Sequence, residues 1–320
     1  MTTEQRTAGI HHVTAFVQDA QRTVDFYSGL LGLRMVKKTI NFDAPEVYHL
    51  YFGNEGGSPG TIITFFPWKG SRHGRVGSGQ VGITAYVVPT DAFEFWQERL
   101  NKFGVDYQET TRFGERYLQF EDPDGLRVEI VAREEGPRSK WTFGGVPADK
   151  AIKGFGGAVL FSGAPNKTGN VLEQVLGFEM EREDGEYRRY RGTGDLGNKI
   201  DILLDPASAG DGVGGSGIVH HIAWRAKDDV DHVAYRSRAL NNGMQPTPVI
   251  DRNYFNAIYF REPGGILFEI ATDPPGFAHD ESFETMGEKL MLPSWFEPHR
   301  EAITAGLPPI EVRVLEADQS

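Results

Sequence analysis

The sequence predicts an α+β protein in which four β-α-β-β-β units pair to form two cupped half-barrels. Two observations support this prediction. The chain repeats itself internally, which is the signature of a fold built from one supersecondary unit. Within each repeat, a strand with period-two alternation is followed by a helix-like stretch and then by short strands bounded by Gly and Pro turns. One sheet with one helix leaves a bare face, so pairing two units buries that face and closes a cup.

The clearest repeat relates the second and fourth units at an offset of 140 residues. The segment RFGERYLQFEDPDGLRVEIV begins at Arg112, and RNYFNAIYFREPGGILFEIA begins at Arg252. At this offset Glu129 corresponds to Glu269. A carboxylate inside an apolar strand therefore occurs twice, at equivalent places in the fold.

A second match relates the first and third units at an offset of 145 residues and places Gly157 where His12 stands. Together the matches outline four units, at residues 8–68, 80–134, 152–205 and 217–273. We expect two domains of two units each and a tail, at residues 1–150, 151–280 and 281–320.

Two segments between units stand out as linker candidates. They are Glu134–Lys150 and Ala207–Gly217. The second linker is rich in Gly and Ser, so we expect a mobile loop, and the sequence leaves open whether it closes over a site. The tail contains a helix-like piece, Phe283–Met291, that could pack over a cup.

The composition, with 39% hydrophobic and 24% charged residues, is that of a folded protein with a core. A net charge of −12 argues against a nucleic-acid-binding protein, which needs a positive surface. With no cysteine, thiolate metal sites and cysteine nucleophiles are excluded. No apolar run is long enough to span a membrane and no signal-peptide core is visible, so we expect a cytoplasmic protein that does not bind membranes. We also expect a homo-oligomer.

Doubled histidines open the first and fourth units, His11-His12 and His220-His221. Alternation puts the two members of each pair on opposite faces of the strand. Apolar residues alternate with the second histidine of each pair, so a helix would cover the apolar face. His12 and His221 are therefore expected to face the cup. By the same period, Glu269 faces the cup between the core residues Phe268 and Ile270.

Two imidazoles and one carboxylate in a cup are the ligands of a facial triad, which leaves three positions of an octahedral metal open. Fe(II) suits such a site, and Mn(II) is possible; Co(II), Ni(II) and Zn(II) would fit similar ligands. The other two units serve as a control, because glycines stand where the histidines would be. Gly82 takes the place of His221 and Gly157 that of His12. We therefore expect units one and four to form the working cup, and Glu129 to be a structural carboxylate paired with Arg112 or Arg127.

Several other residues have both a functional and a structural interpretation. His11 and His220 could support the ligands or could be exposed neighbours. Arg252 and Tyr259 could line the cup, or could form a surface ion pair and a core ring. His49 could be only a strand residue. Five aromatic side chains are available as walls: Phe16, Phe66, Trp224, Phe255 and Phe268.

At these residues the chain resembles the vicinal oxygen chelate superfamily, also called the glyoxalase/bleomycin-resistance/dioxygenase group. More narrowly, it is similar to the ring-cleaving hydroquinone 1,2-dioxygenases. The resemblance runs from Gly9 to Glu281 and is carried by the stretches GIHHVTAFVQDAQRTVDFYSGLLGLRMVKKT, VYHLYFGNEGGSPGTIITFFPW, TRFGERY, GIVHHIAWRA, DRNYFNAIYFREPGGILFEIATD and GFAHDE.

The resemblance implies Fe(II) held by His12, His221 and Glu269. It also implies supporting or substrate-contacting roles for four residues: His11, His220, Arg252 and Tyr259. The implied reaction is extradiol-type cleavage of a hydroquinone with O2. Three alternatives remain open. They are a catechol extradiol dioxygenase, an O2-independent glyoxalase-like isomerase or lyase, and a ligand-sequestering protein without catalysis.

Overall fold

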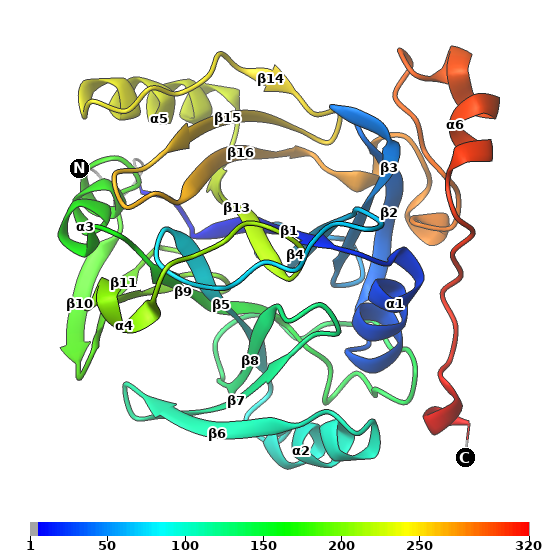
Figure 1. The fold of residues 1–320 in the computed structure, drawn as a ribbon, viewed down its shortest axis with the longest axis horizontal. Helices are drawn as coiled ribbons and strands as arrows, with labels where there is room; N and C mark the ends of the chain where they lie inside the picture. Colours follow the sequence, from blue (N-terminus) through cyan, green and yellow to red (C-terminus); the bar gives the residue numbers. More distant parts are fainter. Residues whose placement is uncertain (1–5, 320) are drawn as a thin grey trace.

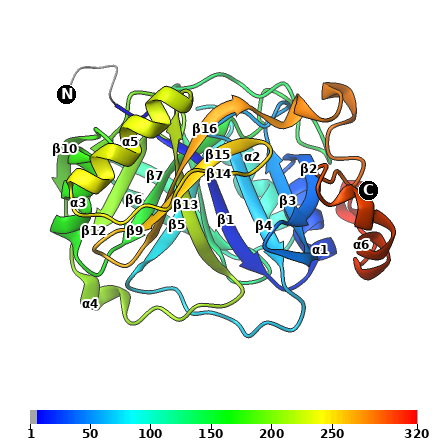
Figure 2. The same cartoon turned by 90° about the horizontal axis from the view of Figure 1, so that it is seen from above.

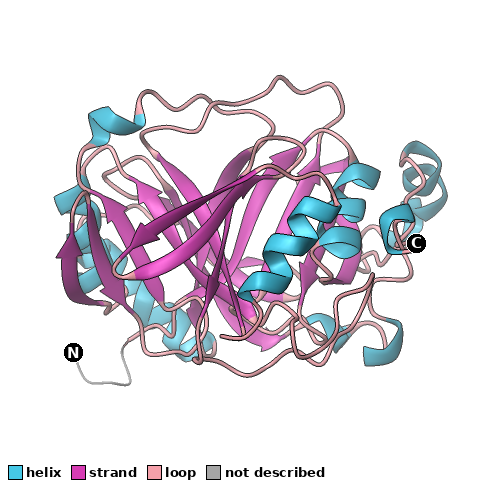
Figure 3. Ribbon diagram, turned by 90° about the horizontal axis from the view of Figure 1, so that it is seen from below, coloured by secondary structure: helices cyan, strands magenta, loops and turns pink. Residues whose placement is uncertain are grey.

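The computed structural model describes residues 6–319 and contains two curled eight-stranded sheets with helices at their periphery (Figures 1 and 3). The predicted α+β architecture of four paired β-α-β-β-β units is confirmed. We call the sheet with the order β14-β15-β16-β13-β1-β4-β3-β2 the first half-barrel. The sheet with the order β10-β11-β12-β9-β5-β8-β7-β6 is the second half-barrel.

The first half-barrel combines the first and fourth units, as predicted. Unit one contains β1 (Ile10–Val17), α1 (Ala20–Val24), a π-helical turn η2 (Asp25–Leu30), β2 (Arg34–Asn41), β3 (Ala44–Gly53) and β4 (Ile62–Pro67). Unit four contains β13 (Ile218–Ala226), α5 (Asp229–Asn241), β14 (Ile250–Asp251), β15 (Phe255–Arg261) and β16 (Leu267–Pro275). Asp19 and Asp228 cap the N-termini of α1 and α5, because their carboxylates accept backbone N–H groups of the first turn.

The second half-barrel combines the second and third units. Unit two contains β5 (Gln80–Val88), α2 (Phe93–Lys102), β6 (Tyr107–Arg112), β7 (Glu115–Glu121) and β8 (Arg127–Ala132). Unit three contains β9 (Gly154–Phe161), α3 (Pro165–Gln174), β10 (Glu179–Asp184), β11 (Tyr187–Arg191), β12 (Lys199–Leu203) and the short α4 (Pro206–Ala209). Each half-barrel thus takes one unit from either side of residue 150, and the division into domains there stays a prediction.

In each half-barrel, the opening strands of two units pair antiparallel at the centre of the sheet (Figure 2). In the first half-barrel this central pair is β1 with β13, flanked by the parallel partners β4 and β16. The faces of β1, β13 and β16 opposite the cup are fully buried against the covering helices. Val13, Trp224 and Phe268 share the main hydrophobic core with Tyr27 and with Tyr235 of α5. Burying these large side chains stabilises the strands that carry the inward-facing residues.

The Gly-rich linker is hydrogen-bonded, which differs from the expected mobile loop. Val213 and Arg75 exchange backbone hydrogen bonds, and the N–H of Gly74 donates to the carbonyl of Ser216 over 2.9 Å. The segment at residues 210–217 therefore pairs with residues 72–78, the linker between the first two units.

The tail runs along β2 and past α1, on the outside of the first half-barrel (Figure 1). The expected helix over Phe283–Met291 is not formed. The segment has a short 3-10 turn, η4 (Phe283–Thr285), because its backbone turns to meet β2, where the N–H of Met291 donates to Lys38. The tail also contains the short turns η3 (Phe277–His279), η5 (Glu297–His299) and η6 (Glu316–Asp318), and the helix α6 (Arg300–Gly306). Within residues 6–319, none of the helices has the length and apolar character needed to cross a membrane.

Candidate metal centre

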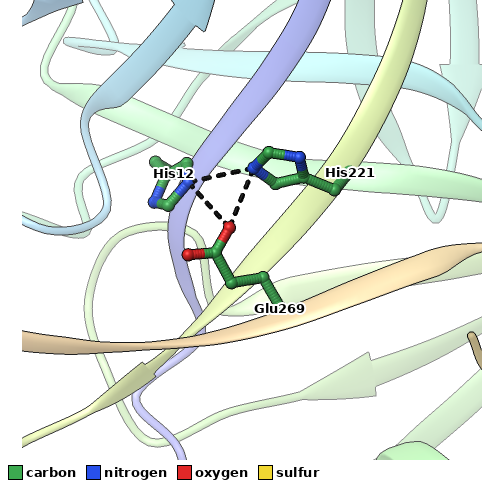
Figure 4. Close-up of side chains that lie close together, drawn as sticks. All are labelled: His12, His221 and Glu269. Atoms are coloured by element: carbon green, nitrogen blue, oxygen red, sulfur yellow. Dashed lines mark hydrogen bonds and ion pairs between the residues drawn. The ribbon is translucent and has the colours of Figure 1, made fainter. Parts of the chain in front are cut away.

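Three adjacent strands bring together the three predicted ligands. β13 lies between β1 and β16, and Ala223 is the cross-strand neighbour of both His12 and Glu269. His221, two residues earlier on β13, reaches into the same space. The Nε2 atoms of His12 and His221 are 3.3 Å apart, and they lie 3.2 and 2.8 Å from Oε2 of Glu269 (Figure 4). All three residues are buried.

Two β-bulges place the first histidine of each pair. In the register of β1 with β13, His11 and His220 are the extra residues without a cross-strand partner. A bulge interrupts the alternation of faces, so two successive side chains can lie close together. The rings of His220 and His221 both line one cavity. The expectation that each pair splits onto opposite faces is therefore wrong, because simple alternation does not include the bulges.

The partners of His11 determine which nitrogen of His12 is free. The Nε2 of His11 lies 3.1 Å from the carbonyl oxygen of Thr272, which can only accept, so His11 carries its hydrogen there. Burial and the neighbouring His12 lower the pKa of His11 well below its usual value, so its Nδ1 is an acceptor. That atom lies 2.9 Å from Nδ1 of His12, which must then donate. The Nε2 of His12 keeps its lone pair and points it at the other two predicted ligands.

His220 stands in the same relation to His221, with Nδ1 atoms 2.8 Å apart. Burial, followed by the charge of His221, lowers the pKa of His220. If the Nε2 of His221 is reserved for a metal, its Nδ1–H donates to His220. His220 then carries its own hydrogen on Nε2 and is a hydrogen-bond donor at the wall of the cavity.

The residues fit a divalent metal. Neither carboxylate oxygen of Glu269 receives a well-formed hydrogen bond from residues 6–319, although the side chain is fully buried. Burial would raise the pKa of Glu269, but the imidazoles of His12 and His221 outweigh it and hold the pKa well below its usual value. A buried carboxylate of this kind needs a cation. Ligand atoms at right angles around a metal at about 2.1 Å lie about 3 Å apart, close to the separations found here.

A cavity of about 440 Å³ opens over these three residues. Of the five aromatic side chains available as walls, Phe16, Phe66 and Phe255 line it. Trp224 and Phe268 do not, because they lie on the opposite face of their strands, in the core beneath the helices. The remaining walls include four side chains that the sequence interpretation did not assign to the cup: Phe42, Asp43, His49 and Trp68.

The alternation of buried residues along β3 places His49 in the cup, and the sequence interpretation did not use it. Tyr48, Leu50 and Phe52 are buried in the main core, so His49 and Tyr51 alternate onto the cup face of β3. The Nε2 of His49 lies 2.8 Å from Oγ1 of Thr64, and its Nδ1 lies 2.8 Å from the hydroxyl of Tyr51. Burial, followed by the charges of His12 and His221, lowers the pKa of His49 well below its usual value.

Arg252 and Tyr259 line the cavity together. Tyr259 is the cross-strand neighbour of Glu269, and its hydroxyl accepts a hydrogen bond from Nε of Arg252 over 3.1 Å. Nη1 of Arg252 also reaches Asp43 in the turn between β2 and β3, over 3.0 Å. Burial and the charge of Glu269 raise the pKa of Tyr259 well above its usual value, so the phenol keeps its proton.

The second half-barrel, all of whose strands lie in the described part of the chain, has no equivalent set of ligands. Its Glu129 pairs with Ala85 just as Glu269 pairs with Ala223. Counting back along β5, Ile83 occupies the place of His221, and Gly82 occupies the bulge position of His220. The predicted match of Gly82 with His221 is therefore wrong by one residue, because the offset is not constant along the strand. The match of Gly157 with His12 is confirmed by their equivalent pairing with these two alanines.

Comparison with known proteins gives consistent matches. A sequence profile described as the Glyoxalase/Bleomycin resistance protein/Dioxygenase superfamily matches residues 9–130 and 154–270. The chain is 60% identical over 312 residues to "Putative ring-cleaving dioxygenase MhqO" of Bacillus subtilis, covering 98% of this chain and 99% of that protein. It is 36% identical over 302 residues to "Chlorohydroquinone/hydroquinone 1,2-dioxygenase" of Sphingobium indicum, covering 91% and 93% of the two chains.

Solved structures agree on the fold. A crystal structure described as a "putative dioxygenase" from Bacillus subtilis superimposes with a TM-score of 0.95 at 61% identity, covering 97% of this chain and 99% of that one. Glyoxalase I from Zea mays has the same fold at 16% identity, with a TM-score of 0.60 over 83% of this chain and 92% of that one.

Proposed function

The chain belongs to the glyoxalase/bleomycin resistance protein/dioxygenase superfamily, and from this premise we propose that it is a ring-cleaving dioxygenase. In this proposal it uses Fe(II), with Mn(II) as a possible substitute, and cleaves a hydroquinone or substituted hydroquinone with O2. The name of the Sphingobium relative supports the choice of a 1,4-diol.

The observation that carries the proposal is the set of three converging donor atoms under an aromatic cavity. Two imidazole nitrogens and one carboxylate oxygen on adjacent strands are the ligands of a facial triad. The cavity above them is walled by rings, which suits a flat aromatic substrate. Bound to His12, His221 and Glu269, the metal would supply Lewis acidity and adjacent open positions for a phenolate oxygen and O2.

The reaction balances without another oxidant. Cleavage breaks the ring bond between a hydroxyl-bearing carbon and its neighbour. One atom of O2 ends on each of these two carbons. In the ring-opened product the first carbon is a carboxylic acid and the second is an aldehyde. The chain must therefore orient the diol and manage the proton of its hydroxyl group.

The cavity offers residues for both tasks. With its hydrogen on Nε2, His220 can hydrogen-bond a substrate oxygen. Tyr259 keeps its phenolic proton and is held in place by Arg252, so it can bind the same oxygen or the second hydroxyl. His11 does not line the cavity and so does not reach the substrate. Its role is to orient the ring of His12.

The test is anaerobic loading with Fe(II), followed by measurement of O2 uptake with hydroquinone, methylhydroquinone, chlorohydroquinone and catechol. Uptake of one O2 per molecule of a 1,4-diol is the expected result. Uptake with catechol alone would replace the proposal with a 1,2-diol dioxygenase. No uptake with any diol by protein that holds its metal tightly would point to an O2-independent enzyme of the superfamily. Parallel loading with Mn(II) tests the choice of metal.

A further inference from the structure

Four side chains form a hydrogen-bonded chain on the β3 side of the cavity. Oγ1 of Thr14 lies 2.7 Å from Oγ1 of Thr64. Oγ1 of Thr64 lies 2.8 Å from Nε2 of His49, and Nδ1 of His49 lies 2.8 Å from the hydroxyl of Tyr51. The sheet brings these groups together, because Thr64 on β4 is the cross-strand neighbour of both Thr14 and Tyr51. None of the four has a role in the function proposed above.

The two ends of this chain lie in different surroundings. Thr14 is fully buried and, within residues 6–319, its hydroxyl has no hydrogen-bond partner besides Thr64. Tyr51, at the other end, lines the cavity over the proposed ligands. Its exposed fraction is 1%, equal to that of His12, which lines the same cavity, so Tyr51 belongs to the deep part of the cavity wall.

The direction of the hydrogen bonds follows from a count of hydrogens. Burial lowers the pKa of His49 well below its usual value, so its neutral ring carries one hydrogen and accepts at the other nitrogen. Four hydrogens therefore compete for three hydrogen bonds. If Tyr51 donates to His49, the hydrogen without an acceptor belongs to one of the two buried threonines. If His49 donates to Tyr51, that hydrogen is on the Tyr51 hydroxyl, at the cavity wall.

The second arrangement is favoured, because a buried donor without an acceptor costs the free energy of its desolvation. At the cavity wall, a bound molecule can accept the hydrogen of Tyr51 instead. The position of Tyr51 suits one end of a ring. In the sheet order, the strands that carry the proposed ligands lie between β3, which carries Tyr51, and β15, which carries Tyr259. Both tyrosines line the same cavity, from opposite arms of the curled sheet.

We propose that Tyr51 determines specificity by donating a hydrogen bond to the oxygen of the diol that lies farther from the triad. His49 is then a positioning residue, since its Nδ1–H occupies the Tyr51 oxygen and turns the hydroxyl hydrogen toward the cavity. The inference rests on the proposed function. The two oxygens of a 1,4-diol lie at opposite ends of the ring, whereas those of catechol are adjacent. A donor at the far end therefore favours the 1,4-diol.

The test compares the binding of hydroquinone and phenol, which differ only in the second hydroxyl, to Fe(II)-loaded protein without O2. The variant is Tyr51→Phe. The matched control is Tyr48→Phe, which removes a phenolic hydroxyl from the other face of β3, where it donates to the carbonyl of Pro308 over 2.9 Å. We expect the wild type and Tyr48→Phe to prefer hydroquinone. Tyr51→Phe should reduce this preference about tenfold and leave the affinity for phenol unchanged.

A double variant separates the positioning role of His49 from a structural one. His49→Phe should also reduce the preference for hydroquinone, because the Tyr51 hydroxyl loses the donor that directs it. If His49 acts through Tyr51, the double variant His49→Phe/Tyr51→Phe should show the same preference as Tyr51→Phe alone. Additive losses would overturn the positioning role.

An unchanged preference in folded, metal-loaded Tyr51→Phe would overturn the proposal. Equal weakening of both ligands would also overturn it, since that result indicates general damage to the site. If Tyr51→Phe does not fold, an anaerobic crystal structure of the wild type with hydroquinone decides the question. A separation of up to about 3.2 Å between the Tyr51 oxygen and the farther hydroquinone oxygen supports the proposal, and a longer one overturns it.

Failure of the proposed function gives a different result, because the binding comparison does not require turnover. The preference for hydroquinone, and its loss in Tyr51→Phe, would then be observed in a protein that consumes no O2. A wild type that binds no hydroquinone would overturn both proposals.

Discussion

The two half-barrels have the same strand order, the same bulge positions and a buried glutamate at the equivalent place, but the partners of that glutamate differ. In the second half-barrel, Glu129 accepts hydrogen bonds from both terminal nitrogens of Arg112, over 3.2 and 2.8 Å. In the first, Glu269 has two imidazoles and, within residues 6–319, no lysine or arginine at hydrogen-bonding distance. A buried charge must be compensated. The second half-barrel supplies its counter-ion from the chain, whereas in the first we propose that a metal takes that role.

A pair of equivalent arginines shows how the difference arises. Arg112 and Arg252 are related by the 140-residue repeat. Arg112 turns inward to Glu129 and also to Asp201, over 2.7 Å, which fills the second cup with ion pairs. Arg252 instead donates to Tyr259, which stands between it and Glu269 in the sheet. The comparison teaches that an arginine paired with the buried glutamate helps to close the second cup, whereas its equivalent, held by Tyr259 and Asp43, leaves the first cup open.

The strongest test of this comparison is removal of the proposed ligands. His12→Ala, His221→Ala and Glu269→Ala should each lose the metal, because two donors hold an ion far more weakly than three. The loss should exceed the roughly 10–100-fold change in affinity that follows removal of a supporting residue. Metal content after desalting, measured by mass spectrometry on folded protein, checks the result. Full metal retention in all three variants would contradict the assignment of these residues as metal ligands.

The matched substitution in the second half-barrel should act on stability instead. Glu129→Gln leaves the buried charge of Arg112 without one of its counter-ions, so we expect the free energy of unfolding to fall by about 3 kcal/mol. Metal content per folded molecule should not change. Urea unfolding together with metal analysis separates the two effects. A variant of normal stability that loses its metal would contradict the division of roles.

His11→Phe tests the support behind one ligand. Phenylalanine keeps a ring beside Phe255 but removes the acceptor for the Nδ1–H of His12. We expect metal affinity to fall about 10–100-fold while the fold is retained. Competition with a chelator measures the change. An affinity equal to that of the wild type would show that His11 only fills space.

The smallest expected effect is a difference in pH response between the half-barrels of the metal-free protein. The pKa values of His11 and His49 are lowered, chiefly by burial. The unfolded chain then binds more protons than the folded one below pH of about 6.5, so stability falls as pH falls through that value. No histidine lies in residues 80–205, which form units two and three. Hydrogen exchange at pH 8 and pH 5.5 should therefore show earlier opening of β1 and β13 than of β5 and β9. Equal loss of protection in both sheets would contradict this.

Much of the site could be predicted because side-chain direction in a strand is a local property. The alternation of side chains along a strand is enough to direct His12 and Glu269 toward the cup. The internal repeat then identifies Glu129 as the equivalent carboxylate that lacks imidazole neighbours. The same argument failed at His11 and His220. A bulge is set by the register with a partner strand, so the residues of one strand do not reveal it. It failed at Gly82 for the same reason, since the offset between repeats shifts within the strand.

The sequence by itself determined the repeat, the alternating faces and the three proposed ligand residues, because these follow from residue order at short range. Only the tertiary structure decided what surrounds them. The walls of the cavity come from β3, β4 and the turn at Asp43 as well as from the ligand strands, and residues 72–78 pair with residues 210–217, more than a hundred positions away. Such contacts depend on how whole sheets curl and pack, which pairs residues that have no relation in the chain.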